Sequence, residues 1–431
     1  MNLNSLPAYR RLSKRKIPPI GIGTLFAIWL GLTVYYYSDE PHSEDVTTTL
    51  LREADIELSL AESLENKPSF VHSLLWCSDE KTTLKRLAGR FEKLEEEGKL
   101  ESYAHTHLKT IQLLQEGKAD ELEVEGWFSE YEEQGLWTWQ YLALKKRGDL
   151  ENLPDIAYSA DWLSRRTLTL AFLGELPWWV LSLVGSVILW KYRAKLRNPP
   201  NALTPVPFWS CSFALGICLL TCVVGDISAF LMYSSPLPWD SFPFATLILS
   251  DTLWRASSVL FASYFLLAKW KDGPRLLGLL KKPNYHLILG AIPIVFICNF
   301  IIYSGWEMIG WGESDGTLDF YEDGWLGLPY IMFSSAIMAP LVEEIVFRGF
   351  LFQGLIHRLG FGRAALLSSL IFALIHNYDV PGSLSVGFFG FLCCWLYKVT
   401  GSLWTGILFH SLYNILITLS VWPLFHGLFS L

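Results

Sequence analysis

The chain has 431 residues, 51% of them hydrophobic and 15% aromatic, with a formal net charge of −8 at pH 7. The negative charge argues against a nucleic-acid partner, because phosphate backbones bind basic surfaces. The apolar residues gather in about nine long runs that are nearly free of charge, which excludes an ordinary soluble protein. The composition therefore predicts an all-α, polytopic membrane helix bundle of about nine spans.

The amino-terminal segment combines a basic tail with an apolar run. Arginine and lysine crowd residues 10–16, and the apolar run extends from Ile17 to about Tyr37. The run is too long for the apolar core of a cleaved signal peptide, and its end lacks a small-x-small cleavage pattern. We therefore predict that residues 1–37 form a cytoplasmic tail and a retained signal-anchor helix.

Residues 38–165 are predicted to form an inserted, acidic helical domain outside the cytoplasm. From Ser38 to Asp161 there are 28 acidic and 13 basic residues, a net charge of −15. Leu84, Leu87 and Phe91 recur at helical spacing, and glycines divide the segment into short helices. Such a domain is suited to recruit substrates or to dock a protein partner.

Eight further apolar runs follow the acidic segment. They cover about residues 168–190, 207–233, 243–268, 284–303, 328–349, 363–378, 384–399 and 402–424. Six of the seven cysteines lie in these runs, where they behave as small apolar residues and offer no disulfide framework. We predict additional transmembrane helices in residues 166–240 and a bundle that carries the chemistry in residues 241–431.

The loops between the runs predict the orientation of the chain. Basic residues crowd the connections at 191–197 and 269–282, whereas the alternate loops at 234–241 and 304–327 contain no lysine or arginine. Cytoplasmic loops carry the excess of basic residues. The amino terminus is therefore predicted to be cytoplasmic, in a multi-pass protein of the plasma (inner) membrane of a bacterium.

Three ionisable residues interrupt the run at 328–349. Glu343, Glu344 and Arg348 each cost about 2.5–3.5 kcal/mol at the centre of a membrane helix, which marks them as functional candidates. Glu344 and Arg348 are four residues apart and share a helix face, so they can form an ion pair. Glu343 lies about 100° further round the helix and is expected to point elsewhere.

Two later runs supply histidines. Phe372 and His376 are four apart, as are His410 and Asn414. A glutamate and a histidine can activate water for attack on a carbonyl, and a histidine beside an asparagine can donate hydrogen bonds to an oxyanion. Alternatively, Glu343 and the two histidines could bind a divalent metal such as zinc, although the chain has no H-E-x-x-H motif.

These motifs resemble those of the CPBP intramembrane endopeptidases. The family includes the type II CAAX prenyl proteases and the bacterial Abi, or bacteriocin self-immunity, proteins. The resemblance rests on Glu343-Glu344-x-x-x-Arg348, on Phe372-x-x-x-His376 and on His410-x-x-x-Asn414, in that order, and covers roughly residues 240–425. It implies an endopeptidase that hydrolyses peptide bonds of membrane-associated proteins or peptides.

Position by position, the resemblance implies Glu343 as the catalytic base and His376 as a residue that orients the water. His410 and Asn414 would form the oxyanion hole, while Glu344, Arg348 and Phe372 would support the site. We favour a mechanism without a cofactor, because histidine and asparagine on one helix face suit hydrogen-bond donation better than metal binding. A zinc-dependent mechanism is the alternative.

Two other functions fit the same residues. A non-catalytic scaffold or bacteriocin-immunity protein could bind peptides in the same cavity without cutting them. A transporter is suggested by further intramembrane charges at Asp226, Asp251 and Arg255, but no internal repeat of spans is evident.

The span limits also leave Glu343 near the basic side and His376 near the opposite end of its run.

Overall fold

The structure is a computed structural model of the whole chain. It describes residues 17–38, 43–75, 77–124, 127–128, 136–197, 202–203, 209–233, 273–309, 324–376 and 378–426. Every regular element among these residues is a helix, so the all-α prediction is confirmed for them. The expected run at 243–268, with Asp251 and Arg255, lies outside the described residues.

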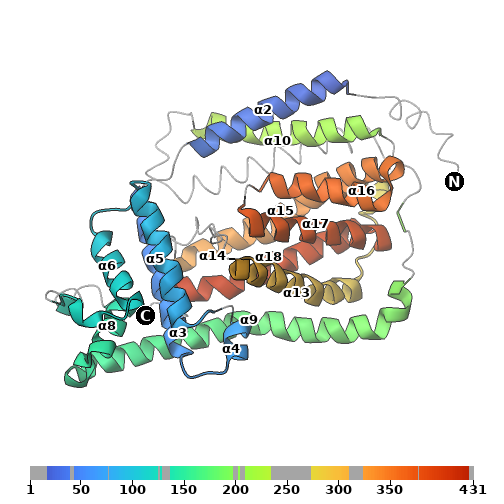
Figure 1. The fold of residues 1–431 in the computed structure, drawn as a ribbon. Coiled ribbons are helices and arrows are strands. Elements are labelled where there is room, and N and C mark those ends of the chain that lie inside the picture. Colours follow the sequence, from blue (N-terminus) through green and yellow to red (C-terminus); the bar gives the residue numbers. More distant parts are fainter. Residues whose placement is uncertain are drawn as a thin grey trace, which may run out of the picture. The chain divides into compact units, whose positions relative to one another are not determined.

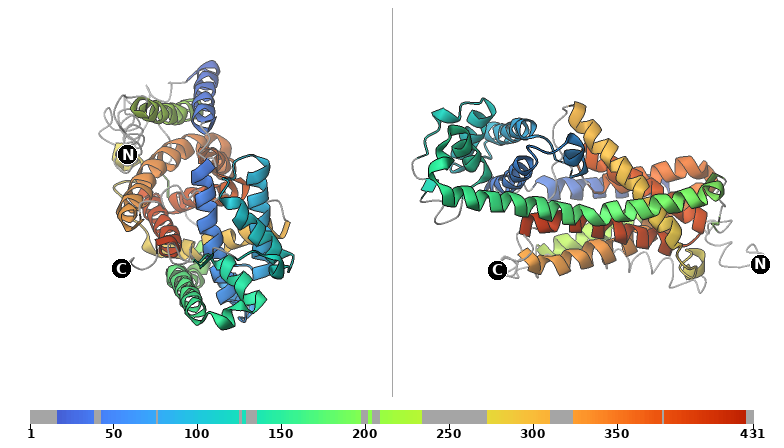
Figure 2. Two further views of the ribbon diagram at one scale, coloured as in Figure 1. Left: turned by 90° about the vertical axis from the view of Figure 1, so that its left-hand side faces the viewer. Right: turned by 90° about the horizontal axis from the view of Figure 1, so that it is seen from below.

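The chain divides into two compact units, which are described separately. The first, here called the bundle, comprises Met1–Ser38 and Pro177–Thr418. The second, here called the helical unit, comprises Asp39–Leu176 and Leu419–Leu431. Helix α9, Pro154–Arg197, contributes to both units and runs unbroken past the domain limit predicted at residue 165 (Figure 2).

The bundle consists of apolar helices. In chain order they are α2 (Pro19–Ser38), the second part of α9, α10 (Cys211–Tyr233), α12 (Gly273–Leu276), α13 (Tyr285–Ile309), α14 (Gly324–Phe333), α15 (Ala339–Glu343), α16 (Gln353–Leu374), α17 (Val380–Thr400) and α18 (Leu403–His426). Two π-helical segments, η5 (Ser334–Met338) and η6 (Glu344–Phe352), flank α15. Helix α2 lies beside α10, and α16 beside α17 (Figure 1).

Six helical stretches of the described part are long and apolar enough to cross a membrane, against about nine expected. The stretch Gly327–Leu374 contains two of the expected runs. Its helices follow one another without a loop until Gly360, whose φ of 73° in the left-handed region breaks the helix. The amino-terminal run is described as the shorter apolar helix Pro19–Leu32.

The chain turns near Gly360, within the long stretch that contains two of the predicted runs. Phe352 and Phe361 meet edge to face across this turn, with ring centroids 6.1 Å apart. The helix that contains Glu343 therefore continues well beyond residue 349, the predicted limit of its run. The side chains of Glu343 and His376 approach each other to 3.8 Å, so the predicted separation of the two residues at opposite ends of their runs is not observed.

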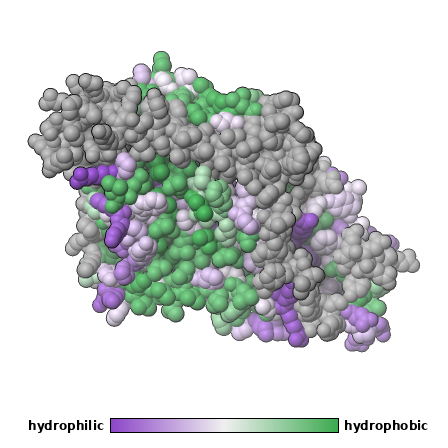
Figure 3. Space-filling model, turned by 180° about the vertical axis from the view of Figure 1, so that it is seen from behind, coloured by the Kyte–Doolittle hydropathy of each residue, from purple (hydrophilic) through white to green (hydrophobic). Residues whose placement is uncertain are grey.

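Apolar side chains also cover the outside of the bundle. Figure 3 shows a broad field of apolar residues on one face of the molecule. Ile301, Leu366 and Leu374 of the candidate spans are 64%, 64% and 57% exposed. A soluble protein rarely presents contiguous apolar surface on this scale, whereas a lipid-facing surface requires it.

The helical unit has a core of its own. It contains α3 (Ser43–Ser63), α4 (Ser69–Leu74), α5 (Glu80–Glu96), α6 (Ala104–Gln115), η2 (Ala119–Glu121), α8 (Thr138–Arg147), η3 (Asp149–Asn152) and the beginning of α9. The residues predicted at helical spacing are buried here, and Leu84, Leu87 and Phe91 of α5 are at most 2% exposed. Glycine closes helix α8 at Gly148, where φ is 79°.

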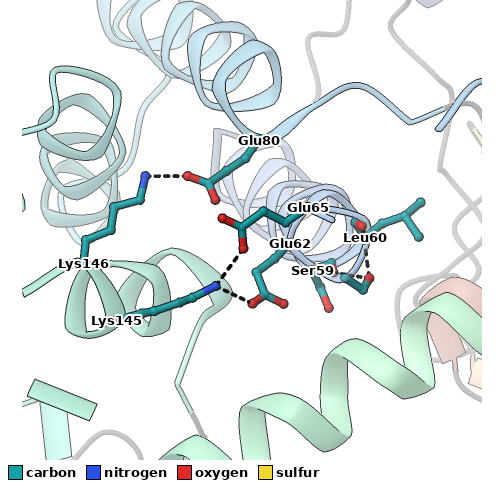
Figure 4. Close-up of polar contacts among 8 residues, drawn as sticks. Ser59, Leu60, Glu62, Glu65, Glu80, Lys145 and Lys146 are labelled. Atoms are coloured by element: carbon teal, nitrogen blue, oxygen red, sulfur yellow. Dashed lines mark hydrogen bonds and ion pairs between the residues drawn. The ribbon is translucent and has the colours of Figure 1, made fainter. Parts of the chain in front are cut away.

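Ion pairs on the surface of the helical unit connect α8 with α3 and α5 (Figure 4). Lys145 lies 3.0 Å from the carboxylates of both Glu62 and Glu65, and Lys146 pairs with Glu80. Asp55 of α3 accepts a 2.6 Å hydrogen bond from the backbone N–H of Thr138 and so caps the start of α8. Removal from solvent raises the pKa of Asp55, although the bonds from Thr138 act in the opposite direction.

This cap predicts different effects for two substitutions. Asp55→Ala removes the acceptor and should destabilise α8 by about 1 kcal/mol, the usual worth of a capping side chain. Asp55→Asn keeps an acceptor oxygen without burying a charge, so it should leave α8 intact. Because the pKa of Asp55 is raised in the folded state, the carboxyl group stabilises the fold at a pH below its ordinary pKa, and this contribution is lost as the pH rises through the raised pKa. At pH 7 the ionised carboxylate is therefore buried at a cost in free energy, and the neutral amide of Asn avoids this cost.

Hydrogen exchange of the full-length protein at pH 7 measures this directly. Peptides covering α8 should exchange faster in Asp55→Ala than in the wild type, and no faster in Asp55→Asn. Equal exchange in all three proteins would show that Asp55 does not cap the helix.

Candidate active site

The two glutamates lie where α15 ends and η6 begins. Glu343 is 7% exposed, and Glu344 and Arg348 are completely buried. π-Helical turns are rare and often occur at functional sites. Here one such segment precedes α15 and another begins at Glu344, so the backbone departs from regular α-geometry on both sides of α15.

Glu344 and Arg348 form the predicted ion pair. Arg348 Nη1 lies 3.1 Å from Glu344 Oε1, and the guanidinium stacks on the ring of Phe372, 4.1 Å from its centroid. Neighbouring helices approach closely only because they carry glycine. A Cβ atom at Gly406 would lie 2.8 Å from Glu344 Oε2, and one at Gly390 would lie 2.8 Å from Arg348 Nη2.

His410 connects the two glutamates. Its Nδ1 lies 3.2 Å from Glu344 Oε1 and its Nε2 lies 3.8 Å from Glu343 Oε2. An ionised carboxylate only accepts hydrogen bonds, so the Nδ1 of His410 carries the proton that is donated to Glu344. This contact was missed by the sequence reasoning, which assigned Glu344 to Arg348 alone.

His376 faces Glu343 from another helix. Its Nδ1 donates a 2.7 Å hydrogen bond to the carbonyl of Phe372, one turn earlier in the same helix. The Nε2 atom is thereby directed outward, and it lies 3.8 Å from Glu343 Oε2. In the neutral imidazole this Nε2 is an acceptor, because the proton is on Nδ1.

Glu343 Oε2 is therefore approached by the Nε2 atoms of two histidines, each at 3.8 Å. These separations are longer than hydrogen bonds, and polar groups at such distances are commonly bridged by water. The side chains predicted from three separate runs of the sequence do converge on one carboxylate.

Asn414 is held by the irregular backbone before the glutamates. Its Nδ2 donates a 2.5 Å hydrogen bond to the carbonyl of Ser335. In π-register that carbonyl would accept from residue 340, which is a proline and has no N–H. The N–H of Ala339, the α-helical alternative, bonds instead to Ser334. The Asn414 amide thus satisfies a carbonyl that Pro340 leaves without its usual helical donor.

Aromatic and polar residues surround this site that the sequence reasoning did not select. Phe389 lies 4.8 Å from the ring of His410 and stacks on Tyr413. Asn299 donates a 3.0 Å hydrogen bond to the hydroxyl of Tyr413 and accepts one of 2.8 Å from Ser385. Polar residues at helical spacing inside apolar runs were the signal that could have identified Asn299 and Ser385.

Two other candidates from the sequence are a metal site and the intramembrane residue Asp226. Among the residues that the structure describes, no group of three His, Cys, Asp or Glu side chains has the arrangement of a metal site. Asp226 lies in α10, outside the segment that carries the glutamates and histidines.

Comparison with known proteins finds a similarity that covers this site. Residues 325–416 match the family described as Type II CAAX prenyl endopeptidase Rce1-like. All of the motif residues from Glu343 to Asn414 lie within that match. This segment is thus similar to the Rce1-like endopeptidases.

A curated relative supports the Rce1-like assignment. The chain is 34% identical over 87 residues to the "Putative membrane peptidase YdiL" of Bacillus subtilis strain 168. The alignment covers 20% of this chain and 35% of YdiL, so the chain spans about a third of the relative's length. No solved structure matches the chain. The predicted CPBP resemblance is confirmed for the Rce1-like segment.

The buried ion pair predicts a large effect of breaking it. Arg348→Ala would leave the Glu344 carboxylate buried without its cation, which typically costs about 3–5 kcal/mol. The double variant Glu344→Gln with Arg348→Met removes both charges and should cost clearly less. Unfolding of the purified proteins in denaturant measures both. A double variant as unstable as Arg348→Ala would show that charge balance is not what holds these residues.

The role of Asn414 predicts coupling with Pro340. Asn414→Ala leaves the Ser335 carbonyl without a donor and should destabilise the protein by about 1–3 kcal/mol. Adding Pro340→Ala restores a backbone N–H at residue 340, so the double variant should recover part of that loss. The same denaturant unfolding measures the coupling, and strictly additive effects would contradict this account.

Proposed function

We propose that the chain is an intramembrane endopeptidase in which Glu343 activates the water that hydrolyses a peptide bond. The observation that carries the proposal is the approach of two histidine Nε2 atoms to Glu343 Oε2. Each histidine has its Nδ1 held by an acceptor, so both rings are fixed with Nε2 toward the carboxylate.

In the proposed reaction, one water molecule donates hydrogen bonds to Glu343 and to the neutral Nε2 of His376. Both partners are acceptors, so the lone pairs of the water oxygen are free to attack the carbonyl carbon of the substrate. Glu343 takes a proton as the new C–O bond forms. It returns the proton to the amine as the C–N bond breaks, which regenerates the carboxylate.

The negative charge on the carbonyl oxygen needs hydrogen-bond donors. In this proposal His410 supplies Nε2–H from a doubly protonated ring, whose Nδ1–H is held by the carboxylate of Glu344. Asn414 carries two amide hydrogens, so donation to Ser335 leaves the second for the oxyanion. Fixed donors of this kind stabilise the transition state without reorganisation.

We propose that the reaction uses no metal, because hydrogen bonding alone accounts for the role of each imidazole. The substrates would be membrane-associated proteins or peptides, because the candidate spans and the apolar surface of the bundle support a site within a bilayer. The bacterial relative and the basic loops support an inner-membrane location with a cytoplasmic amino terminus.

The proposal predicts that Glu343→Gln abolishes proteolysis and leaves the fold intact. Loss of a general base typically lowers a rate about 10²–10⁴-fold. Comparative proteomics of membranes from cells with the wild-type or the Glu343→Gln protein should reveal uncut precursors. Each precursor is then incubated with purified protein in proteoliposomes, and the appearance of new termini measures cleavage.

Matched variants control for nonspecific effects. Glu116→Gln, in the helical unit, and His286→Ala, at the exposed start of α13, should cleave normally, whereas His376→Ala should not. Parallel reactions with a chelator test the metal-free mechanism, which requires full activity. Normal cleavage by Glu343→Gln would overturn the proposal, and a cellular phenotype that survives this substitution would favour a non-catalytic peptide-binding role.

A further inference from the structure

An apolar patch on α4 stands out in the otherwise acidic helical unit. Phe70 is 64% exposed and Leu74 is 41% exposed. The two residues are four apart, so they share one face of this short helix. Lys67, just before the helix, is exposed beside them. Large apolar side chains exposed together generally mark an interaction surface.

A hydrogen bond within the helical unit connects α3 with the start of a candidate membrane span. The candidate span Arg165–Ala194 begins within it, and Phe172 and Leu173 of that span are 48% and 43% exposed, as lipid contact requires. Thr167, the third residue of the span, accepts a 3.1 Å hydrogen bond from the hydroxyl of Ser59 in α3. Both residues are buried, so the end of α3 lies against the point where α9 becomes apolar.

Helix α4 is tied to that same end of α3. His72 Nε2 forms a 2.9 Å hydrogen bond with the carbonyl of Leu64. Leu64 is five residues after Ser59, which corresponds to roughly 7–8 Å of helical rise. Lys145 holds the same region through Glu62 and Glu65 (Figure 4). His72 lies two residues from both Phe70 and Leu74, so these two face away from the contact with α3.

We propose that α4 is an interfacial anchor that inserts Phe70 and Leu74 into the surface of the bilayer that α9 enters. The hydrogen bond between Ser59 and Thr167 sets the depth, and the bond between His72 and Leu64 sets the orientation of the exposed face. A short amphipathic helix with aromatic and aliphatic residues on one side and a lysine nearby suits the headgroup region. The occupant of the patch is therefore lipid.

Site-specific photocrosslinking in proteoliposomes tests this placement. A diazirine amino acid replaces Phe70 in the full-length protein, reconstituted into vesicles of phosphatidylethanolamine and phosphatidylglycerol. The same amino acid at Tyr103, which is 46% exposed on α6 of the same unit, is the matched control. We expect lipid adducts at position 70, identified by mass spectrometry, at least about tenfold above those at position 103.

Crosslinks from position 70 to a peptide of this chain or of a second copy, with no lipid adduct, would overturn the proposal in favour of a protein contact. Equal lipid labelling at both positions would overturn it as well. A second measurement uses Phe70→Ser with Leu74→Ser, which leaves the core of the unit unchanged. Hydrogen exchange across α4 should then rise severalfold in vesicles relative to the wild type, and an unchanged rate would contradict the anchor.

Discussion

The buried ion pair between Glu344 and Arg348 is the constraint on which the site depends. A carboxylate and a guanidinium in a membrane bundle are tolerable only together, and each is enclosed by helices that approach through glycine. Because Glu344 also accepts from His410, the pair fixes the ring that faces Glu343. Polar contacts thus link Arg348 through Glu344 to His410, whose Nε2 lies 3.8 Å from Glu343 Oε2.

Irregular backbone serves the same site. Two π-helical segments flank α15, and Pro340 leaves the carbonyl of Ser335 without its usual helical donor. In a bilayer such a carbonyl must find a partner inside the protein, and Asn414 supplies it. The residue expected to bind an oxyanion therefore also keeps the helix that carries Glu343 in place.

The helical unit relates to the membrane through its own contacts. Helix α9 extends from it into a candidate span, and Ser59 binds that helix where it becomes apolar. An acidic domain could stand clear of the bilayer, but the apolar face of α4 lies close to this boundary. Under the proposed anchoring of α4, the unit rests on the membrane surface.

The sequence by itself determined the all-α class, the helices of the acidic segment and the four-residue spacing of Glu344 with Arg348. These features depend on local periodicity and on the free-energy cost of a charge in an apolar run. Both can be recognised from residues that are close together in the sequence. Only the tertiary structure decided that His410 joins both glutamates, that Asn414 binds Ser335 and that Phe372 carries Arg348. Those contacts link residues more than twenty positions apart, and their geometry depends on π-turns and glycines that bring helices together in ways that no local pattern specifies.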